Sequence, residues 1–226
     1  MAFNIVIGCP IYLREWCLPR WLSSVFNQGI EPSNIVLIFG LTDSEEDNTR
    51  QLLEKYGAKV KDFYIIDCND LKAFKDRSPE RFYPLVEIRN RILEKVREIN
   101  PDWYFSWDSD ILLPDTSLPK LIARDVDLCS PYVELVKGIP NCMDRMPNCD
   151  GFRRHKPLLE HYPKDSFYKV GASFACLLFK KGTYDIVYSW HQAGEDLGFA
   201  LDAYEKGFEF YIDSTIEGVH LFNRDI

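Results

Sequence analysis

Two aspartates, Asp108 and Asp110, directly follow the apolar run 103–107, which suits a buried strand. In an extended chain, side chains two residues apart point to the same side, so these like charges would repel each other unless a positive charge lay between them. Hard divalent cations such as Mg²⁺ and Mn²⁺ prefer carboxylate oxygens as ligands. The spacing therefore predicts a metal site, although an isolated D-x-D triplet also occurs as an ordinary turn or capping pair.

A second acidic pair and a late histidine could extend the same chemistry. Glu195 and Asp196 stand at the expected start of a helix, just after the aromatic Trp190 and Gly194. The dipole of a helix favours carboxylates at its N-terminus, so this pair also has a purely structural explanation. His220 lies in an apolar run, where most histidines are packed core residues, but imidazole also binds Mn²⁺-type ions. These residues are therefore candidates for catalytic and metal-binding positions.

The elements expected around these residues alternate between strands and helices. The first strands are apolar along their whole length, which is typical of a parallel sheet covered on both faces. In the first half we expect strands at 4–10, 35–40, 62–66 and 103–107 and helices at 15–28, 42–57 and 84–99. The second half is less regular, with strands expected at 127–136, 172–180, 208–213 and 218–222, a helix at 196–207 and a loop-rich insertion at 138–170. The pattern predicts an α/β fold with a mainly parallel sheet.

Length and composition indicate a single globular domain over residues 1–226, with 46% hydrophobic and 27% charged residues. The net charge of −8 argues against broad nucleic-acid binding, which depends on clustered Lys and Arg. No apolar run reaches membrane-spanning length, and no signal-like segment is found at the N-terminus. The seven scattered cysteines are expected to be mostly reduced thiols. Together these features predict a cytoplasmic protein.

Acidic residues follow several of the predicted strands, which is where open α/β sheets bind their ligands. Asp43 follows the second strand, Asp67 the third, and Asp108 and Asp110 the fourth. Neither G-x-G-x-x-G nor the lysine-bearing phosphate loop is present, because Gly8 is the only glycine of the first turn. If a nucleotide diphosphate binds at this edge, a metal ion has to neutralise it.

In their order along the chain, these residues resemble the GT-A glycosyltransferases, and among them glycosyltransferase family 2 most. The shared pattern is Pro-Ile-Tyr after the first strand, Asp after the second, D-x-D after the fourth, Gly-Glu-Asp on a late helix and a near-terminal His. The resemblance spans residues 5–220 and implies a GT-A, Rossmann-like fold with a central mixed, mainly parallel sheet flanked by helices. It also implies a nucleotide-diphosphate-sugar donor, with a UDP-sugar as the first expectation, and Mn²⁺ or Mg²⁺ bridging its phosphates.

The resemblance implies a role for each candidate residue. Asp108, Asp110 and His220 would bind the metal, with Asp110 as the direct ligand. Asp196 would be the base of an inverting reaction, and Glu195 would orient an acceptor or donor hydroxyl. The residues implied to contact the donor are Pro10, Ile11, Tyr12, Arg14, Asp43, Arg89, Asn90, Asp108, Ser109, Trp190 and Gly194.

The resemblance also assigns residues 1–114 to a nucleotide-sugar-binding half and residues 115–226 to an acceptor and catalytic half. The sequence departs from the family after the second strand, where the segment 40–44 replaces the usual Asp-Gly-Ser-x-Asp and leaves base recognition by Asp43 open. The Q-x-x-R-W helix of processive members and a membrane segment are both absent. These absences favour a transferase that adds a single sugar to an acceptor that the sequence does not identify.

The insertion at 138–170 is locally basic inside an acidic chain and lies where this fold usually places acceptor-facing loops. It is either a solvated loop or a contact for an anionic acceptor, such as a phosphorylated carbohydrate, a lipid-linked phosphate or a modified nucleic acid. The residues that make it locally basic are Arg145, Arg153, Arg154, His155 and Lys156. A zinc site is disfavoured, because C-x6-C-x5-H-x5-H is not knuckle spacing; its ligands would be Cys142, Cys149, His155 and His161.

Three other functions fit parts of this pattern. A phosphohydrolase of the haloacid dehalogenase type also has D-x-D after an apolar strand, but there the pair normally follows the first strand of the core. A sugar nucleotidyltransferase needs a glycine-rich N-terminal loop, which this chain lacks. A non-catalytic nucleotide-sugar-binding module would not need D-x-D, Glu-Asp and His together. The sequence therefore favours a glycosyltransferase, with the binding module as the main alternative.

Overall fold

The computed structural model describes residues 4–45, 47–71, 79–136, 138–145, 151–153 and 164–222. Its first half consists of β1 (Ile5–Ile11), α1 (Leu18–Phe26), β2 (Ile35–Leu41), α2 (Thr49–Gly57), β3 (Asp62–Asp67), α3 (Phe82–Ile99), β4 (Trp103–Trp107) and β5 (Ile111–Leu112), with 3-10 turns at Pro32–Asn34 and Pro79–Arg81. Its second half consists of α4 (Ser117–Ile122), β6 (Leu128–Val136), β7 (Ile139–Pro140), β8 (Cys142–Arg145), β9 (Phe152–Arg153), β10 (Phe167–Val170), β11 (Ala172–Ser173), β12 (Cys176–Lys180), α5 (Glu195–Glu205) and β13 (Phe210–His220).

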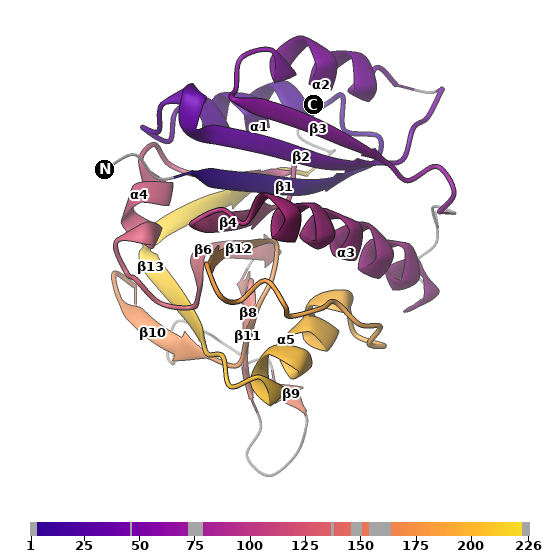
Figure 1. Cartoon of the computed structure of the whole chain (residues 1–226). Helices are drawn as coiled ribbons and strands as arrows, with labels where there is room; N and C mark the ends of the chain where they lie inside the picture. The colour runs from indigo at the N-terminus through magenta and orange to yellow at the C-terminus, as the bar shows by residue number, and fades with distance from the viewer. Residues whose placement is uncertain are drawn as a thin grey trace.

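A ten-stranded mixed sheet runs through the molecule in the order β10-β13-β6-β12-β4-β1-β2-β3, with β5 paired to β13 and β7 to β6. A small second sheet has the order β11-β8-β9. Helices α1 and α2 cover one face of β1 to β3, and α3 covers the other (Figure 1). This arrangement confirms the predicted α/β fold with a mixed sheet flanked by helices. Within the described ranges, no helix combines the length and apolar character that crossing a bilayer needs.

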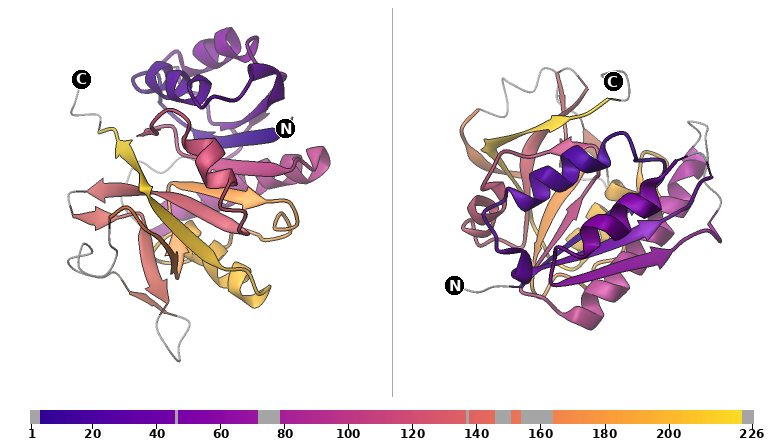
Figure 2. Two further views of the ribbon diagram at one scale, coloured as in Figure 1. Left: turned by 90° about the vertical axis from the view of Figure 1, so that its left-hand side faces the viewer. Right: turned by 90° about the horizontal axis from the view of Figure 1, so that it is seen from above.

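The strands of the first half separate two hydrophobic cores. Ile5 and Ile7 of β1 belong to the core under α1 and α2, whereas Val6 belongs to the core under α3. All residues of β2 are buried, which explains its uniformly apolar sequence. Seen from above, α1 and α2 lie over the same face of the strands (Figure 2, right). Burial on both faces therefore fixes this half of the sheet.

Two glycines let α3 approach the sheet closely. A Cβ atom added to Gly40 of β2 would lie 2.3 Å from Ile88 Cγ2, and one added to Gly8 of β1 would lie 2.7 Å from Ile92 Cγ2. Real Cβ atoms do not approach other atoms that closely, so both positions need glycine. The close approach places Arg89, the residue after Ile88, at the carboxyl edge of the sheet.

The carboxyl edge also receives segments from the second half. Strands β1, β2, β3 and β4 run parallel, so their C-terminal loops lie side by side. β12 runs antiparallel to β4, and Asp108 donates its N–H to the carbonyl oxygen of Ala175 at 2.8 Å. The end of β13 pairs with β5, with His220 opposite Ile111. Residues far apart in sequence therefore meet beside the D-x-D segment.

The prediction of a helix start at 42–47 was wrong, because α2 begins at Thr49. Two acidic residues before it, Asp43 and Asp47, lie outside the helix, and their side chains bind other groups. Asp47 accepts the N–H of Thr49 at 3.1 Å and its hydroxyl at 2.8 Å, so this carboxylate holds the entry to the helix from outside it. The carboxylate of Asp43 binds the guanidinium of Arg50.

The second half differs from its predicted elements in three places. The strand predicted at 172–180 is two strands, β11 and β12, because Ala175 adopts a φ of 67°. The two strands predicted at 208–213 and 218–222 are one, β13, with an irregularity in its pairing between Asp213 and Glu217. The segment predicted to be loop-rich contains β7 to β10. Several residues named for this segment lie outside the described residues, namely Cys149, Arg154, His155, Lys156 and His161.

We predict that Gly40→Ala lowers the free energy of unfolding by about 1–3 kcal/mol, the usual cost of overpacking a core. The added methyl group collides with Ile88, so Gly40→Ala combined with Ile88→Ala should lose less than the sum of the two single changes. Urea unfolding of the original protein, the two single variants and the double variant measures this coupling. Ser23→Ala, on the exposed side of α1, is a control expected to stay within about 0.5 kcal/mol of the original protein. Strict additivity would contradict the close approach of α3.

Candidate active site

One buried guanidinium, that of Arg89 on α3, holds the acidic residues of the site together. Its Nη2 donates to Asp108 Oδ1 at 2.9 Å, its Nε to Glu195 Oε1 at 3.1 Å and its Nη1 to Ser106 Oγ at 3.1 Å. The residue is 5% exposed, and its Cζ lies 5.5 Å from the centre of the Tyr188 ring. Arg89 therefore links α3, β4 and α5 while balancing the charge of two carboxylates.

The backbone at Gly194 directs the start of α5 into the site. Gly194 has φ 136° and ψ 150°, a conformation that residues with a Cβ atom rarely adopt. Glu195 and Asp196 then occupy the first turn of the helix, where its dipole favours negative charge. Glu195 is 5% exposed, whereas Asp196 is only partly buried. The glycine thus sets the direction of both acidic side chains.

The electrostatic environment raises the pKa of two of the carboxyl groups. For Asp108, burial raises the pKa above its ordinary value, and the charge of Arg89 acts in the opposite direction. For Asp196, burial is again the main cause, the neighbouring Glu195 carboxylate raises the pKa further, and Arg89 opposes both. A carboxylate with a raised pKa is a stronger base than an ordinary aspartate, which suits proton transfer.

These residues line one pocket of about 570 Å³. Asp108 and Arg89 form one side, and the start of α5 with Asp196 forms another. A second pocket of about 270 Å³ lies against the loop after β1 and is lined by four of the predicted donor contacts, Pro10, Ile11, Tyr12 and Arg14. Arg81 and Leu85 line both pockets. The two pockets are therefore neighbouring parts of one cleft.

Asp110, the second aspartate of D-x-D, faces a histidine and an arginine. Its Oδ2 atom lies 3.2 Å from Arg14 Nη2 and 3.8 Å from His220 Nε2. Burial acts to raise the pKa of Asp110, but His220 and Arg14 together lower it below its ordinary value. In turn, Asp110 raises the pKa of His220. The pairing of β5 with the end of β13 brings His220 to this position.

The orientation of His220 suits a metal ligand. Its Nδ1 lies 2.8 Å from the carbonyl oxygen of Leu135, which can only accept a hydrogen bond, so Nδ1 carries the proton. In the neutral ring, Nε2 then presents its lone pair toward Asp110, the arrangement seen when imidazole binds metals. Among the described residues, no three or more His, Cys, Asp or Glu side chains gather as a complete metal site. The carboxylate of Asp110 and the imidazole of His220 offer donor atoms of the kinds that Mn²⁺ accepts, and their metal-binding roles stay predictions.

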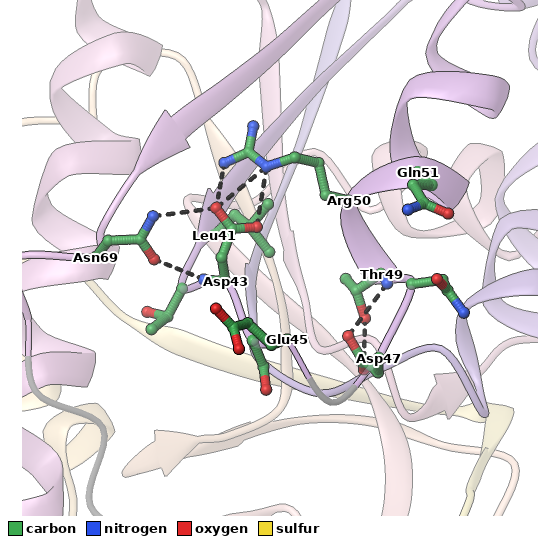
Figure 3. A pocket seen from close by; sticks show the side chains of 11 residues that line it. Leu41, Asp43, Glu45, Asp47, Thr49, Arg50, Gln51 and Asn69 are labelled. Atoms are coloured by element: carbon green, nitrogen blue, oxygen red, sulfur yellow. Dashed lines mark hydrogen bonds and ion pairs between the residues drawn. The ribbon is translucent and has the colours of Figure 1, made fainter.

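Asp43 lines a third pocket, of about 510 Å³, beside the start of α2 (Figure 3). Its carboxylate accepts two bonds from Arg50 Nε, at 2.9 and 3.1 Å, and one from Asn69 Nδ2 at 3.0 Å. Asn69 also accepts the N–H of Asp43 at 2.7 Å. These bonds lower the pKa of Asp43, chiefly through Arg50. Thr42 lines both this pocket and the one beside Tyr12, so Asp43 lies at the end of the cleft.

No protein-family model and no curated protein sequence matches the chain. Solved structures do match. The structure of GalNAc-T7 with UDP, GalNAc and Mn²⁺ superposes with a TM-score of 0.66 at 12% identity and covers 97% of this chain and 44% of that one. TarS 1-349 of S. aureus in complex with UDP-GlcNAc gives 0.62 at 15% identity, covering 97% and 59%. A197 from STIV gives 0.55 at 11% identity, covering 97% and 86%.

The chain has the GT-A fold. It spans less than two thirds of the length of GalNAc-T7 and of the TarS chain. The GT-A fold predicted from the sequence is thus confirmed by architecture, at sequence identities of 11 to 15% in these three matches. The roles of individual residues stay predictions, because fold likeness at this identity does not test them.

Three of the predicted donor contacts do not line the two pockets that form the cleft, which we call the GT-A cleft. Asn90 exchanges two bonds of 2.9 Å with the backbone of Tyr188, so its amide supports the segment before α5. Ser109 is 2% exposed and lines neither part of the cleft. Trp190 is 41% exposed and stacks on Tyr83 with ring centres 5.3 Å apart. Their positions favour supporting roles for Asn90 and Ser109.

The GT-A cleft also contains residues that the sequence did not single out. Arg81 lines both pockets and brings a positive charge to their junction. Its place just before the helix predicted at 84–99 was the one available signal. Ser106 and Tyr188 contact Arg89, but nothing in their local sequence indicates it. Such contacts depend on strand pairing and helix packing.

We predict that Arg89→Met lowers the free energy of unfolding by about 3–5 kcal/mol, because removing one partner leaves buried carboxylates without their counter-charge. Urea unfolding measures the loss. Arg91→Met on the same helix is a matched control, since Arg91 binds two more exposed carboxylates and its loss should cost no more than about 1 kcal/mol. Equal losses in the two variants would mean that Arg89 does not organise the site.

Proposed function

We propose that the protein is a metal-dependent glycosyltransferase that moves one sugar from a UDP-sugar to an acceptor hydroxyl. The observation that carries this proposal is the cleft at the carboxyl edge of the sheet. In it, Asp108 and Asp196 share one pocket, and Arg81 joins that pocket to the one beside Tyr12. A cleft with an apolar end and an acidic end suits a donor that has a flat base at one end and a reacting sugar at the other.

The solved structures support the choice of donor. TarS 1-349 is described in complexes with UDP-GlcNAc and with UDP, and GalNAc-T7 in a complex with UDP, GalNAc and Mn²⁺. Their shared fold with this chain makes a UDP-sugar the first donor to test. The acceptor of this chain is a separate matter, and we propose only that it presents a hydroxyl to Asp196.

The donor would lie along the cleft in a fixed direction. We place its base in the smaller pocket, against Pro10, Ile11 and Tyr12. The diphosphate would then lie near Arg14 and Asp110, and the sugar in the larger pocket beside Asp108 and Asp196. Asp43 stays our proposal for the base or ribose end, with its carboxylate held by Arg50.

Asp110 and His220 would hold a Mn²⁺ or Mg²⁺ ion, with Asp108 beside them. When bound, such an ion supplies positive charge that stabilises the departing diphosphate. Arg89 keeps the Asp108 carboxylate in place at 2.9 Å, so that Asp108 would present a fixed oxygen to the donor side of the cleft.

Asp196 would act as the base. In the transfer step, the acceptor oxygen bonds to the anomeric carbon, the bond from that carbon to the diphosphate oxygen breaks, and the acceptor proton passes to the Asp196 carboxylate. A single displacement of this kind inverts the anomeric centre. Glu195, fixed by Arg89 at 3.1 Å, would orient a hydroxyl of the acceptor or donor.

We also propose that the chain acts as one domain in the cytoplasm, with residues 1–114 binding the donor and residues 115–226 the acceptor. The six cysteines within the described residues are buried and free of disulfides, which supports a reducing compartment. The basic residues at 145 and 153–156 fit an anionic acceptor, although most of them lie outside the described residues.

The proposal predicts that UDP with Mn²⁺ raises the thermal stability of the protein and that a chelator removes the effect. A ligand that binds only the native state at 100 times its Kd adds about 2.7 kcal/mol of stability. Asp110→Ala should abolish the Mn²⁺-dependent part of the shift, because it removes a metal ligand. Asp115→Ala, an exposed aspartate five residues later, is the control that should keep the full shift.

GDP, CDP and dTDP in the same assay identify the nucleotide. A shift with another diphosphate would replace UDP while keeping the transferase. A shift that survives both the chelator and Asp110→Ala would remove the metal assignment. No shift with any nucleotide, together with hydrolysis of a phosphomonoester, would favour the phosphohydrolase instead.

Asp196→Asn is predicted to leave Mn²⁺-UDP binding intact while cutting turnover about 10²- to 10⁴-fold, the usual contribution of a general base. Slow release of UDP from UDP-GlcNAc, UDP-GalNAc, UDP-glucose or UDP-galactose, with water as acceptor, provides the readout. Glu205→Gln, at the exposed end of the same helix, should keep full turnover. Near-normal turnover in Asp196→Asn would sink its role as base, and donor binding without any turnover in the unaltered protein would favour a binding module.

A further inference from the structure

We propose that Arg14 is an exchangeable counter-ion: its guanidinium holds Asp110 in the donor-free protein and moves to the diphosphate when a metal ion takes its place. The proposal rests on the proposed function and deepens it, because it couples the binding of metal to the binding of nucleotide. It concerns one side chain of the loop between β1 and α1 and one oxygen of the D-x-D segment.

The same carboxylate oxygen serves both partners. Asp110 Oδ2 lies 3.2 Å from Arg14 Nη2 and 3.8 Å from His220 Nε2. Because Leu135 holds Nδ1 of the histidine, the ring keeps Nε2 directed at this oxygen. Arg14 therefore supplies positive charge beside the two groups that fit a divalent cation. A cation bound there and a guanidinium paired with the same oxygen would repel each other strongly at this separation.

The backbone of Arg14 is fixed while its side chain has room to move. Its N–H donates to Thr49 Oγ1 at 2.9 Å, and its carbonyl oxygen accepts the N–H groups of Cys17 and Leu18 at 3.1 and 2.9 Å. The side chain is 34% exposed and lines the smaller pocket, where we place the base of the donor. A guanidinium on a fixed stem at the rim of that pocket can turn from Asp110 to a diphosphate without a change in the main chain.

The two arginines that pair with the aspartates of D-x-D differ in how freely their side chains can move. Arg89, the partner of Asp108, has a side chain only 6% exposed and is also held by Glu195, so it stays in place. Arg14 has a single carboxylate partner among the ion pairs of the described residues, and that pair is partly open to solvent. When a divalent cation neutralises Asp110, Arg14 loses its partner, and a diphosphate offers the bidentate contact that a guanidinium prefers.

Exchange of this kind makes the two ligands cooperative. Metal alone has to displace Arg14 into solvent, so it binds weakly. With nucleotide present, the displaced guanidinium gains a new anionic partner, so the metal binds more tightly, and by linkage the nucleotide binds more tightly with metal. Removing the guanidinium should strengthen metal binding alone and weaken nucleotide binding.

Calorimetric titration with MnCl₂, without and then with UDP, tests the proposal through binding rather than activity. We expect Arg14→Gln to bind Mn²⁺ alone about tenfold more tightly than the original protein, a typical effect of one nearby charge. In saturating Mn²⁺, the same variant should bind UDP about tenfold more weakly. Arg20→Gln removes an equal charge from the exposed side of α1 and should change neither affinity.

Arg14→Lys is the second variant, used also if Arg14→Gln folds poorly by circular dichroism. It keeps the charge without the planar fork, so Mn²⁺ alone should bind as weakly as to the original protein while UDP binds more weakly. Mn²⁺ affinities that agree within about twofold between the original protein and Arg14→Gln, or no Mn²⁺ binding to either, would overturn the exchange. The proposed function would survive the failure of the exchange if UDP still binds the original protein and Arg14→Gln with Mn²⁺, and if Asp110→Ala still abolishes that binding.

Discussion

The burial of one positive charge constrains the rest of this site. Arg89 is almost fully enclosed, and a buried guanidinium is tolerated only when carboxylates and polar groups surround it. Its partners Asp108 and Glu195 come from opposite halves of the chain, at the end of β4 and the start of α5. Misplacing either element would leave charges unpaired inside the protein. The electrostatic requirement that stabilises the fold is therefore the same one that holds the acidic groups of the cleft together.

Packing determines where that charge lies. α3 approaches β1 and β2 closely because Gly8 and Gly40 present no side chain to it, and the approach sets the height of Arg89 above the sheet. On the other side of the edge, the pairing of β5 with β13 delivers His220 to Asp110. The pairing of β13 with β6 is irregular between Asp213 and Glu217, resumes at Glu217 and Gly218, and is followed by pairing with β5 at Val219 and His220. Helix packing therefore positions Arg89, and strand pairing positions His220, at the same carboxyl edge of the sheet.

The two aspartates of D-x-D consequently have distinct environments although they are one residue apart. Asp108 has its pKa raised by burial and is held by a fixed arginine, whereas Asp110 has its pKa lowered by His220 and Arg14, against the effect of burial. Asp108 is paired with an enclosed arginine, whereas Asp110 faces a more exposed arginine and a histidine.

The sequence by itself determined the α/β class and the acidic segments at the strand ends, because burial on both faces demands uniformly apolar strands and parallel strands end at one edge. It also suggested Asp108, Asp196 and His220 as site residues, through their order along the chain rather than through any single motif, and their roles stay predictions. It did not reveal that α2 begins at Thr49, nor that Asn90 supports the backbone of Tyr188, a contact between residues distant in sequence. Only the tertiary structure decided which charges meet. Residues 89 and 195 are far apart along the chain, and no local pattern encodes the desolvation that makes their pairing obligatory.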